Sequence, residues 1–361
     1  MVRLPAVSWS SVVPVLAIVA LALAWGRELS VAGALILGVF LAGAVLAAVH
    51  HAEVVAHRVG EPFGSLVLAV AVTVIEVGLI VSLMVSGGPG TASLARDTVF
   101  AAVMITCNGI VGLSLMARTI GGRVAMFNAE GAGGMLATVA TLATVSLVLP
   151  TFTTSTPGPE FSPAQLGFAA VASITLYGMF VITQTVRHRD YFLPITVGGD
   201  VVDEHAAPPS ARSAVLSLGM LLVSLVAVVG LAKTESPAIE AAVTAAELPH
   251  SVVGVVIALL VLLPETLAAV RAALRDRVQI SLNLALGSAM ASIGLTIPTI
   301  AVASLWLDGR LVLGLDATHM VLLGLTVVVG TLTVVPGRAT MLQSGVHLVL
   351  LACFLFLAVS P

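Results

Sequence analysis

The sequence is poor in charged residues. Only 9% of its 361 residues are Asp, Glu, Lys or Arg, whereas soluble globular chains carry about 25%. Aromatic residues are also scarce, at 4%, and hydrophobic residues make up 59% of the chain. So few charges cannot cover the surface of a water-soluble protein of this length. The composition therefore excludes a soluble fold and predicts an integral membrane protein.

Other shortages exclude further classes. The 15 Lys and Arg are outnumbered by 18 Asp and Glu, so the chain lacks the basic excess of a nucleic-acid-binding protein. The two cysteines, Cys107 and Cys353, lie inside apolar runs, and a disulfide framework is not expected. The sequence shows no aspartate dyad, serine–histidine pair or histidine-rich zinc motif at membrane depth. We therefore expect neither an intramembrane hydrolase nor a bound cofactor.

What the chain does have is a succession of long apolar runs. Most are long enough, at about 17–25 residues, to cross a hydrocarbon core of about 30 Å as helices. None alternates with period two, as the strands of a membrane barrel do. We predict an all-α integral membrane protein with eleven transmembrane helices, at about 12–26, 29–49, 64–86, 97–117, 134–151, 164–186, 212–232, 250–272, 280–306, 317–335 and 343–359.

The basic residues fall mainly on one side of these predicted helices. Eleven of the 15 Lys and Arg lie on the side of the N-terminus. The four on the opposite side are Arg27, Arg96, Lys233 and Arg310. Because cytoplasmic loops are enriched in Lys and Arg, this bias predicts a cytoplasmic N-terminus and a C-terminus outside.

Two segments of the chain resemble each other. The first half contains VTVIEVGLIV around Glu76, followed by ARDTV at 95–99. The second half contains VLLPETLAAV around Glu265, followed by LRDRV at 274–278. The glutamates lie in the third and eighth predicted helices, and an odd separation of five gives the two halves opposite orientations. Inverted repeats of this kind recur in secondary transporters, with the binding site at the midplane.

This repeat predicts how the chain is organised. We expect two inverted five-helix repeats, preceded by an extra helix and joined by a polar cytoplasmic linker that contains Asp200, Asp203 and Glu204. The predicted parts are 1–28 (extra N-terminal helix), 29–186 (first five-helix repeat, with α-repeat 1 at about 61–117), 187–211 (cytoplasmic polar linker) and 212–361 (second five-helix repeat, with α-repeat 2 at about 250–306).

Glu76 and Glu265 are the candidate transport residues. Glu76 lies about 16 Å from the start of its predicted helix, at 1.5 Å per residue. A carboxylate at that depth costs several kcal/mol unless it is protonated, paired or hydrated. Since no Lys or Arg lies at a similar depth, protons and metal cations from solution are the expected partners. The alternative is a protonated glutamate that only bonds to a neighbouring helix.

Several small or polar residues fall near these glutamates in the predicted helices. They are Thr73, Asn108, Asn283, Gly287 and Ser288. Their hydroxyl, amide and carbonyl oxygens suit a hard cation such as Ca²⁺. The alternative is that small residues merely allow helices to pack closely.

The histidines are predicted to have other roles. His50, His51 and His57 lie with Glu53 and Glu61 at the cytoplasmic junction of two helices, and we interpret this group as an interfacial polar cap rather than a metal site. The sequence also places His250, His319 and His347 at span ends.

The same residues carry a family resemblance. The segment HAEVVAHRVGEPFGSLVLAVAVTVIEVGLIVSLM (51–84) resembles the ChaA-like proton antiporters for calcium, sodium and potassium, a branch of the calcium/cation antiporter superfamily. The likeness continues through 96–115, 263–298 and 337–350. It implies an eleven-helix fold with two inverted repeats, cation/proton exchange, and a bacterial cytoplasmic (inner) membrane location. It also places the superfamily's two glutamates at Glu76 and Glu265.

The sequence departs from the superfamily at one kind of position. The pattern Gly-Asn-x-x-Glu usually precedes each glutamate, but Val72-Thr73 and Val261-Leu262 stand at the matching places here. Two side-chain oxygens associated with calcium binding are therefore missing, and the preference among Ca²⁺, Na⁺ and K⁺ stays open. The resulting hypothesis is a cation/proton antiporter whose partners are these ions, H⁺ and the lipid bilayer. A cation channel lined by the same glutamates is the alternative, and the sequence leaves homo-oligomer formation open.

Overall fold

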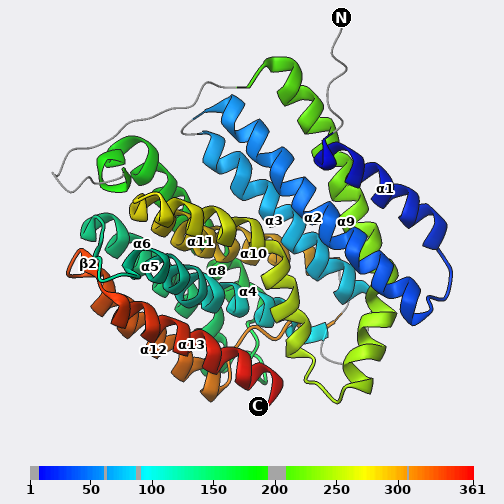
Figure 1. Ribbon diagram of the computed structural model, residues 1–361. Helices are drawn as coiled ribbons and strands as arrows, with labels where there is room; N and C mark the ends of the chain where they lie inside the picture. Colours follow the sequence, from blue (N-terminus) through cyan, green and yellow to red (C-terminus); the bar gives the residue numbers. More distant parts are fainter. Residues whose placement is uncertain (1–7, 61–62, 87–90, 194–208, 307–308) are drawn as a thin grey trace, which may run out of the picture. The chain divides into compact units, whose positions relative to one another are not determined.

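The chain forms a bundle of apolar helices (Figure 1). The computed structural model describes residues 8–60, 63–86, 91–193, 209–306 and 309–361. Within these ranges, 10 helical stretches are long and apolar enough to cross a membrane, and α1 (Trp9–Ala24) is a shorter apolar helix. The prediction of an all-α, multi-pass membrane protein is confirmed. The acidic residues of the predicted linker, Asp200, Asp203 and Glu204, lie outside the described residues.

The helices divide into two compact units, and the first combines the N-terminal helices with one from the middle of the chain. Unit 1 spans Met1–Gly88 and Ala206–Glu247. It contains α1, α2 (Val31–Val59), α3 (Phe63–Ser86) and α9 (Ala211–Ala245). Both α2 and α9 pack against each of the other three helices. His51 of α2 joins two of them, because its Nε2 lies 2.8 Å from the Ser10 carbonyl oxygen and its Nδ1 3.2 Å from Ser217 Oγ.

The second unit contains the remaining helices. Unit 2 spans Pro89–His205 and Leu248–Pro361. Its first span is one continuous rod made of α4 (Leu94–Met104), the π-helical segment η2 (Ile105–Ile110) and α5 (Val111–Thr119). This rod contacts α10, α11 and α13. In its most apolar stretch 89% of the residues are buried, so the rod forms the core of the unit.

Around this rod lie six further spans and a short β-pair. They are α6 (Ala129–Ala143) continued by η3 (Thr144–Val148) and α7 (Leu149–Phe152), α8 (Pro163–Ile182) continued by η4 (Thr183–Arg187), α10 (Ser251–Leu274), α11 (Val278–Ala303), α12 (Ala317–Val334) and α13 (Met341–Val359). Of two short 3-10 turns, η1 (Thr91–Ser93) precedes the rod and η5 (Arg189–Phe192) follows η4. The strands β1 (Ala125–Met126) and β2 (Arg338–Ala339) pair antiparallel, and they hold the start of α6 beside the start of α13.

Local sequence signals explain where several helices begin. At α8, Ser162 and Gln165 form a capping box that satisfies two backbone N–H groups, and Pro163 follows at the first helical position. At α9, Ser210 Oγ accepts a hydrogen bond from the Ser213 N–H at 3.2 Å. Hydropathy placed most helix limits within a few residues of those observed.

The end of α9 differs from the sequence prediction. The predicted span stopped at residue 232, because Lys233, Thr234 and Glu235 lower the local hydropathy, but the helix continues to Ala245. Its extension is partly buried: Glu235 is 5% exposed and Ser236 is fully buried. Pro237 lies inside the helix without ending it. The polar residues that suggested a loop are therefore part of the packed helix.

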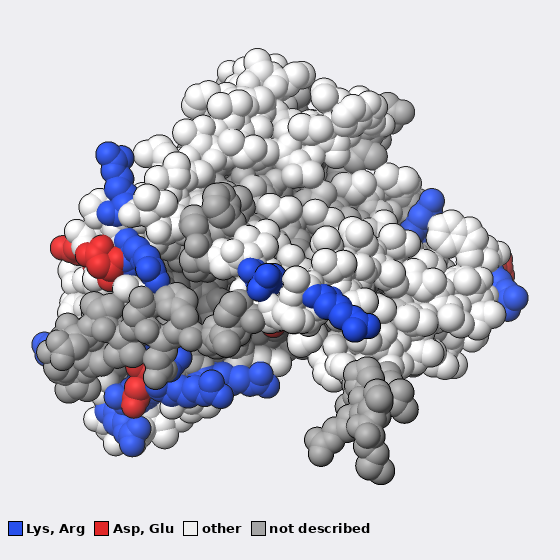
Figure 2. Space-filling model, turned by 90° about the horizontal axis from the view of Figure 1, so that it is seen from above, with Lys and Arg blue, Asp and Glu red and all other residues white. Residues whose placement is uncertain are grey.

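Basic residues mark one end of unit 2. The ends of α5 and α10 meet there, since Arg118 Nε lies 2.5 Å from Asp276 Oδ1. The starts of α6 and α11 also meet there, because the Asn128 N–H donates to Gln279 Oε1 at 2.7 Å. The arginines near these helix ends are Arg118, Arg123, Arg187, Arg189, Arg271, Arg275, Arg277 and Arg338. In Figure 2 the visible Lys and Arg side chains gather mainly toward the left of the view.

The compact units do not follow the predicted halves of the chain. The first predicted repeat, 29–186, supplies α2 and α3 to unit 1 and its other helices to unit 2. The second, 212–361, likewise supplies α9 to unit 1 and the rest to unit 2. The packing thus interleaves the two halves, while their inverted relationship stays a prediction.

Candidate functional site

Glu76 lies in unit 1, close to the middle of the 24-residue helix α3, and is 3% exposed. Thr73 lies one turn earlier on the same side of the helix and is also buried, at 6%. Two residues after the glutamate, Gly78 lets α3 approach α9: a Cβ there would lie 2.8 Å from Cγ2 of Val229. Both predicted residues of this helix therefore belong to its buried face.

Glu265 lies in unit 2, also close to the middle of a 24-residue helix, α10, and is 8% exposed. Pro264 precedes it and has no N–H, so the carbonyl of Leu260 has no helical donor one turn later. Gly254 brings the same helix against the core rod: a Cβ there would lie 2.8 Å from the Thr98 N and 2.9 Å from the Asp97 carbonyl carbon. The two predicted glutamates thus share a helix length, a position near the middle of the helix and a high degree of burial, in different units.

Asn108 is fully buried in the π-helical segment η2, which contacts α10, α11, α12 and α13. Its Nδ2 donates to Thr326 Oγ1 at 2.9 Å, and its Oδ1 lies 3.2 Å from Nδ1 of His347. On the other side of the imidazole, Nε2 lies 3.1 Å from Thr333 Oγ1. π-turns inside α-helices are frequent at functional sites, and this one presents an amide in the core of the unit.

The bond directions in this network can be deduced. Thr326 Oγ1 donates to the Leu322 carbonyl at 2.8 Å, so it accepts from Asn108. Asn108 Oδ1 is then an acceptor, and His347 Nδ1 must carry the proton. In a neutral imidazole Nε2 is then the acceptor and takes the hydrogen bond from Thr333. His347, which the sequence placed at a span end, is instead a buried core residue, 1% exposed, because its ring turns inward to Asn108.

Asn283 lies near the start of α11 and ties three segments together. Its Nδ2 donates to the Phe192 carbonyl at 2.6 Å, and its Oδ1 accepts from Gln279 Nε2 at 2.9 Å. Gln279 in turn accepts the Asn128 N–H. These contacts anchor η5 and the start of α6 at the basic end of unit 2. A role for Asn283 beside an ion stays a prediction.

Gly287 and Ser288 lie one turn further along α11 and are half-buried. A Cβ added at Gly287 would meet no heavy atom within 4 Å. Close helix packing therefore does not require a glycine here, in contrast to Gly254. The space next to Gly287 is open instead.

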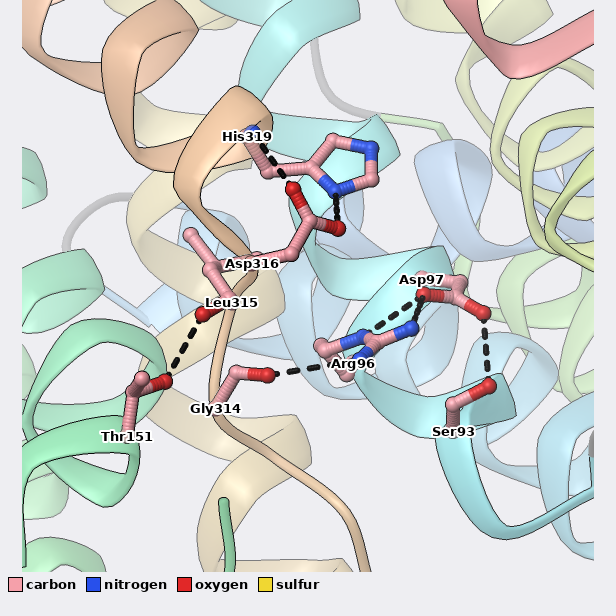
Figure 3. A network of polar contacts seen from close by, with 8 residues as sticks. All are labelled: Ser93, Arg96, Asp97, Thr151, Gly314, Leu315, Asp316 and His319. Atoms are coloured by element: carbon pink, nitrogen blue, oxygen red, sulfur yellow. Dashed lines mark hydrogen bonds and ion pairs between the residues drawn. The ribbon is translucent and has the colours of Figure 1, made fainter. Parts of the chain in front are cut away.

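The opposite end of unit 2 carries a second polar network (Figure 3). Arg96 Nη2 lies 2.7 Å from Asp97 Oδ1, and Ser93 Oγ donates to Asp97 Oδ2 at 2.9 Å. Arg96 also donates to the Gly314 carbonyl at 3.3 Å, and Thr151 Oγ1 donates to that of Leu315 at 2.7 Å. These bonds hold the segment before α12 against α4 and α7, as Figure 3 shows.

A cleft of about 540 Å³ lies beside this network, bordered by Arg96, Thr151 and Asp316. Asp316 caps α12 by accepting the His319 N–H at 3.0 Å, and its Oδ2 lies 2.5 Å from His319 Nδ1. Burial alone raises the pKa of Asp316, but the hydrogen bonds and charge of His319, together with Arg96, outweigh burial and lower it. His319 thus lies at a span end, as the sequence predicted.

The predicted histidine group near the end of α2 is partly described. His51 is buried in the bonds to Ser10 and Ser217, and His50 faces the Trp9 ring, 5.9 Å between centroids. Glu61 lies outside the described residues. Among the residues that the structure describes, no group of three or more His, Cys, Asp or Glu is placed to hold a metal ion.

A multi-pass helical protein with carboxylates buried at mid-helix has the architecture of an ion transporter. Family comparison agrees and is more specific. The chain belongs to the family described as sodium/calcium exchanger protein, whose model matches residues 29–186 and 216–360.

Two curated relatives cover nearly the whole chain. The putative ionic transporter y4hA of Sinorhizobium fredii (strain NBRC 101917 / NGR234) is 46% identical over 361 residues, which is 98% of this chain and 96% of the relative. The sodium-potassium/proton antiporter ChaA of Escherichia coli (strain K12) is 34% identical over 354 residues, 96% of this chain and 94% of the relative. The resemblance to ChaA-like antiporters is thereby confirmed.

Solved structures share the fold at low sequence identity. Native YfkE matches with a TM-score of 0.73 and 13% identity, covering 98% of this chain and 99% of that one. The H⁺/Ca²⁺ exchanger CAX matches with a TM-score of 0.71 and 16% identity, covering 96% of this chain and 86% of that one. The membrane-exchanger fold therefore extends over almost the entire sequence.

Proposed function

We propose that this protein is an antiporter that moves cytoplasmic Ca²⁺, Na⁺ or K⁺ outward in exchange for external protons. The observation that carries this proposal is the pair of buried glutamates, Glu76 and Glu265, each close to the middle of a 24-residue membrane helix in a chain of the exchanger family. Each carboxyl binds cation and proton in turn.

The chemistry follows from desolvation. A buried carboxylate is unstable as a lone charge, so burial favours its protonated form and raises its affinity for any cation that reaches it. Protons and metal ions then compete for the same oxygens. When the site opens alternately to the two sides, this competition couples the outward step of one ion to the inward step of the other.

The predicted inverted repeats would provide the alternating access. Two facts support them: the glutamates lie near the middle of two helices of equal length, α3 and α10, and the family model matches two separate segments, 29–186 and 216–360. Inverted repeats place equivalent binding residues at the midplane with opposite orientation. We extend this proposal to the topology, with the N-terminus in the cytoplasm of a bacterial inner membrane and the C-terminus outside.

The ligands available near the glutamates bear on the choice of ion. Ca²⁺ takes six to eight oxygen ligands. Thr73 offers one hydroxyl oxygen one turn before Glu76, and Leu262 offers none before Glu265. The Escherichia coli relative is named a sodium-potassium/proton antiporter. Both features support Na⁺ and K⁺ as substrates beside Ca²⁺.

The proposal is tested with purified protein in liposomes that contain a pH-sensitive dye and hold an imposed pH difference. We expect at least one of Ca²⁺, Na⁺ and K⁺ to collapse the pH difference in the wild type. Glu76→Gln and Glu265→Gln should each abolish that effect while the variants still fold. Glu240→Gln, at a half-buried carboxyl of α9, is the matched control and should keep it. Cation flux that ignores the pH difference would favour the channel, and full activity in either glutamine variant would refute the site.

A further inference from the structure

A third glutamate is buried in unit 1, in the part of α9 that lies beyond the predicted end of the span. Glu235 is 5% exposed, and its Oε1 is buried without a hydrogen-bond partner among the described residues. The same is true of Oγ of the next residue, Ser236. Buried polar groups in folded proteins are nearly always hydrogen-bonded, so two adjacent exceptions need an explanation.

The carboxyl of Glu235 lies over a glycine of the neighbouring helix. A Cβ on Gly38 of α2 would be 3.9 Å from Oε2 and 4.0 Å from Oε1 of Glu235. Two residues on, Pro237 has no N–H, and so the carbonyl of Lys233 is left without its usual helical donor. The position therefore combines a carboxyl, a hydroxyl and a backbone carbonyl.

No cation on the helices of unit 1 faces this carboxyl in the described ranges. The sequence of α1 has no titratable residue, and that of α3 has only Glu76. The titratable residues of α2 begin at His50, about 18 Å along the helix from Gly38 at 1.5 Å per residue. On α9, Lys233 Nζ lies over the Trp25 ring, 6.0 Å from its centroid. Arg27 and Glu28, between α1 and α2, and Arg212 of α9 are exposed, and Glu240 of α9 is half-buried.

The position of Glu235 along the bundle is informative. Gly78 of α3 lies level with Val229 of α9, and Ser82 Oγ lies 3.4 Å from the Val229 carbonyl. The bond between His51 and Ser217 and the proximity of Gly38 to Glu235 show that α2 and α9 run antiparallel. Because α2 and α3 are consecutive, packed helices separated by only three residues, they also run antiparallel, and α9 and α3 therefore run parallel. Glu235 therefore lies about 12 Å further along the bundle than Glu76, toward the end at which α2 begins. That end is the predicted outer side.

We propose that Glu235 is a proton-binding residue of this transporter, which takes up protons on the outer side of Glu76 and releases them toward it. An isolated carboxylate at this burial is unstable, and a proton neutralises it without further ligands. A metal ion would need several more oxygens, and the described residues offer no cluster of metal-ligating side chains here. The part of Glu235 in transport rests on the proposed exchange function; its protonation does not.

Infrared difference spectroscopy between neutral and alkaline buffer tests the protonation. We expect a band from a protonated, non-hydrogen-bonded carboxyl group that disappears at alkaline pH in the wild type. The band should be lost in Glu235→Gln and kept in Glu240→Gln, which removes a half-buried carboxyl of the same helix. Glu235→Asp, which retains an acid in nearly the same place, should restore a titrating band at a shifted frequency. Identical spectra for wild type and Glu235→Gln would overturn the proposal.

The transport role is tested on the same proteins in liposomes by varying the external pH. We expect Glu235→Gln to lose exchange first at alkaline external pH, where protons are scarce, and Glu240→Gln to follow the wild-type profile. An unchanged pH profile in Glu235→Gln would overturn the transport role. If the carboxyl band is present but the wild type shows no proton-coupled transport, the proposed exchange function fails while the proton site stands.

Discussion

Gly254 and Gly287 allow a sharp test of how unit 2 positions its glutamate. Gly254 brings α10, which carries Glu265, against backbone atoms of α4, whereas Gly287 faces open space. The same change, glycine to alanine, should therefore have opposite effects at the two positions. A helical Gly→Ala substitution gains about 1 kcal/mol in helix propensity.

At Gly254 that gain is outweighed. The added Cβ would lie 2.8 Å from Thr98 N, 2.9 Å from the Asp97 carbonyl carbon and 3.0 Å from Asp97 Cβ, and backbone atoms cannot move aside as a flexible side chain can. Overpacking of a well-packed core costs about 1–3 kcal/mol, and contacts with backbone belong at the upper end. We expect Gly254→Ala to lower stability by about 2 kcal/mol and Gly287→Ala to raise it by about 1 kcal/mol.

Thermal unfolding of the purified variants in detergent measures both effects, with wild type in the same detergent as reference. The two unfolding temperatures should move in opposite directions. Gly254→Ala should also impair exchange, because it displaces the helix that bears Glu265. If Gly254→Ala were as stable as wild type or more stable, the close approach of α10 to α4 would be refuted. A loss of stability in Gly287→Ala would refute the open space beside that residue.

Two further predictions concern the polar networks of unit 2. His347→Ala removes the donor to Asn108 Oδ1 and should lower the free energy of unfolding by about 1–3 kcal/mol, because the buried amide oxygen loses its partner. Thermal unfolding measures this loss, and an unchanged unfolding temperature would contradict the network. The lowered pKa of Asp316 means that its charge stabilises the folded protein above the pKa of the unfolded chain, and that this contribution is lost as the pH falls through the folded value. Asp316→Asn keeps a capping side chain but removes the charge, so it should be less stable than wild type at neutral pH and equal to it in acid. A difference independent of pH would contradict a stabilising role for the Asp316 charge.

Much of the candidate site was predictable because burial in a membrane leaves a strong local signal. Glu76 and Glu265 stand out in the sequence as single charges inside apolar runs, and both are buried in the structure. Thr73 and Asn108 were found by their distance along the helix from such landmarks, and both are buried as well. The role of these residues in binding an ion stays a prediction.

Other residues could not be identified from local sequence. His347 lies six residues into an apolar helix and resembles a span-end histidine until α12 and α13 are packed against η2. Glu235 follows a lysine and precedes a proline, which are typical of a loop, and only the continuation of α9 reveals its burial.

The sequence by itself determined the class of protein, the course of the membrane spans and the two mid-helix glutamates. These properties are local. The free energy of placing backbone polar groups or a charged side chain in hydrocarbon depends mainly on the residues of a single helix. The tertiary structure decided which helices share a unit and that α9 packs with α2 and α3. It also decided which residues surround Asn108, Asn283 and Gly287. Those properties depend on contacts between residues more than a hundred positions apart, such as Asn108 with His347. Hydropathy cannot predict such contacts, because a helix face buried in protein and one exposed to lipid are almost equally apolar.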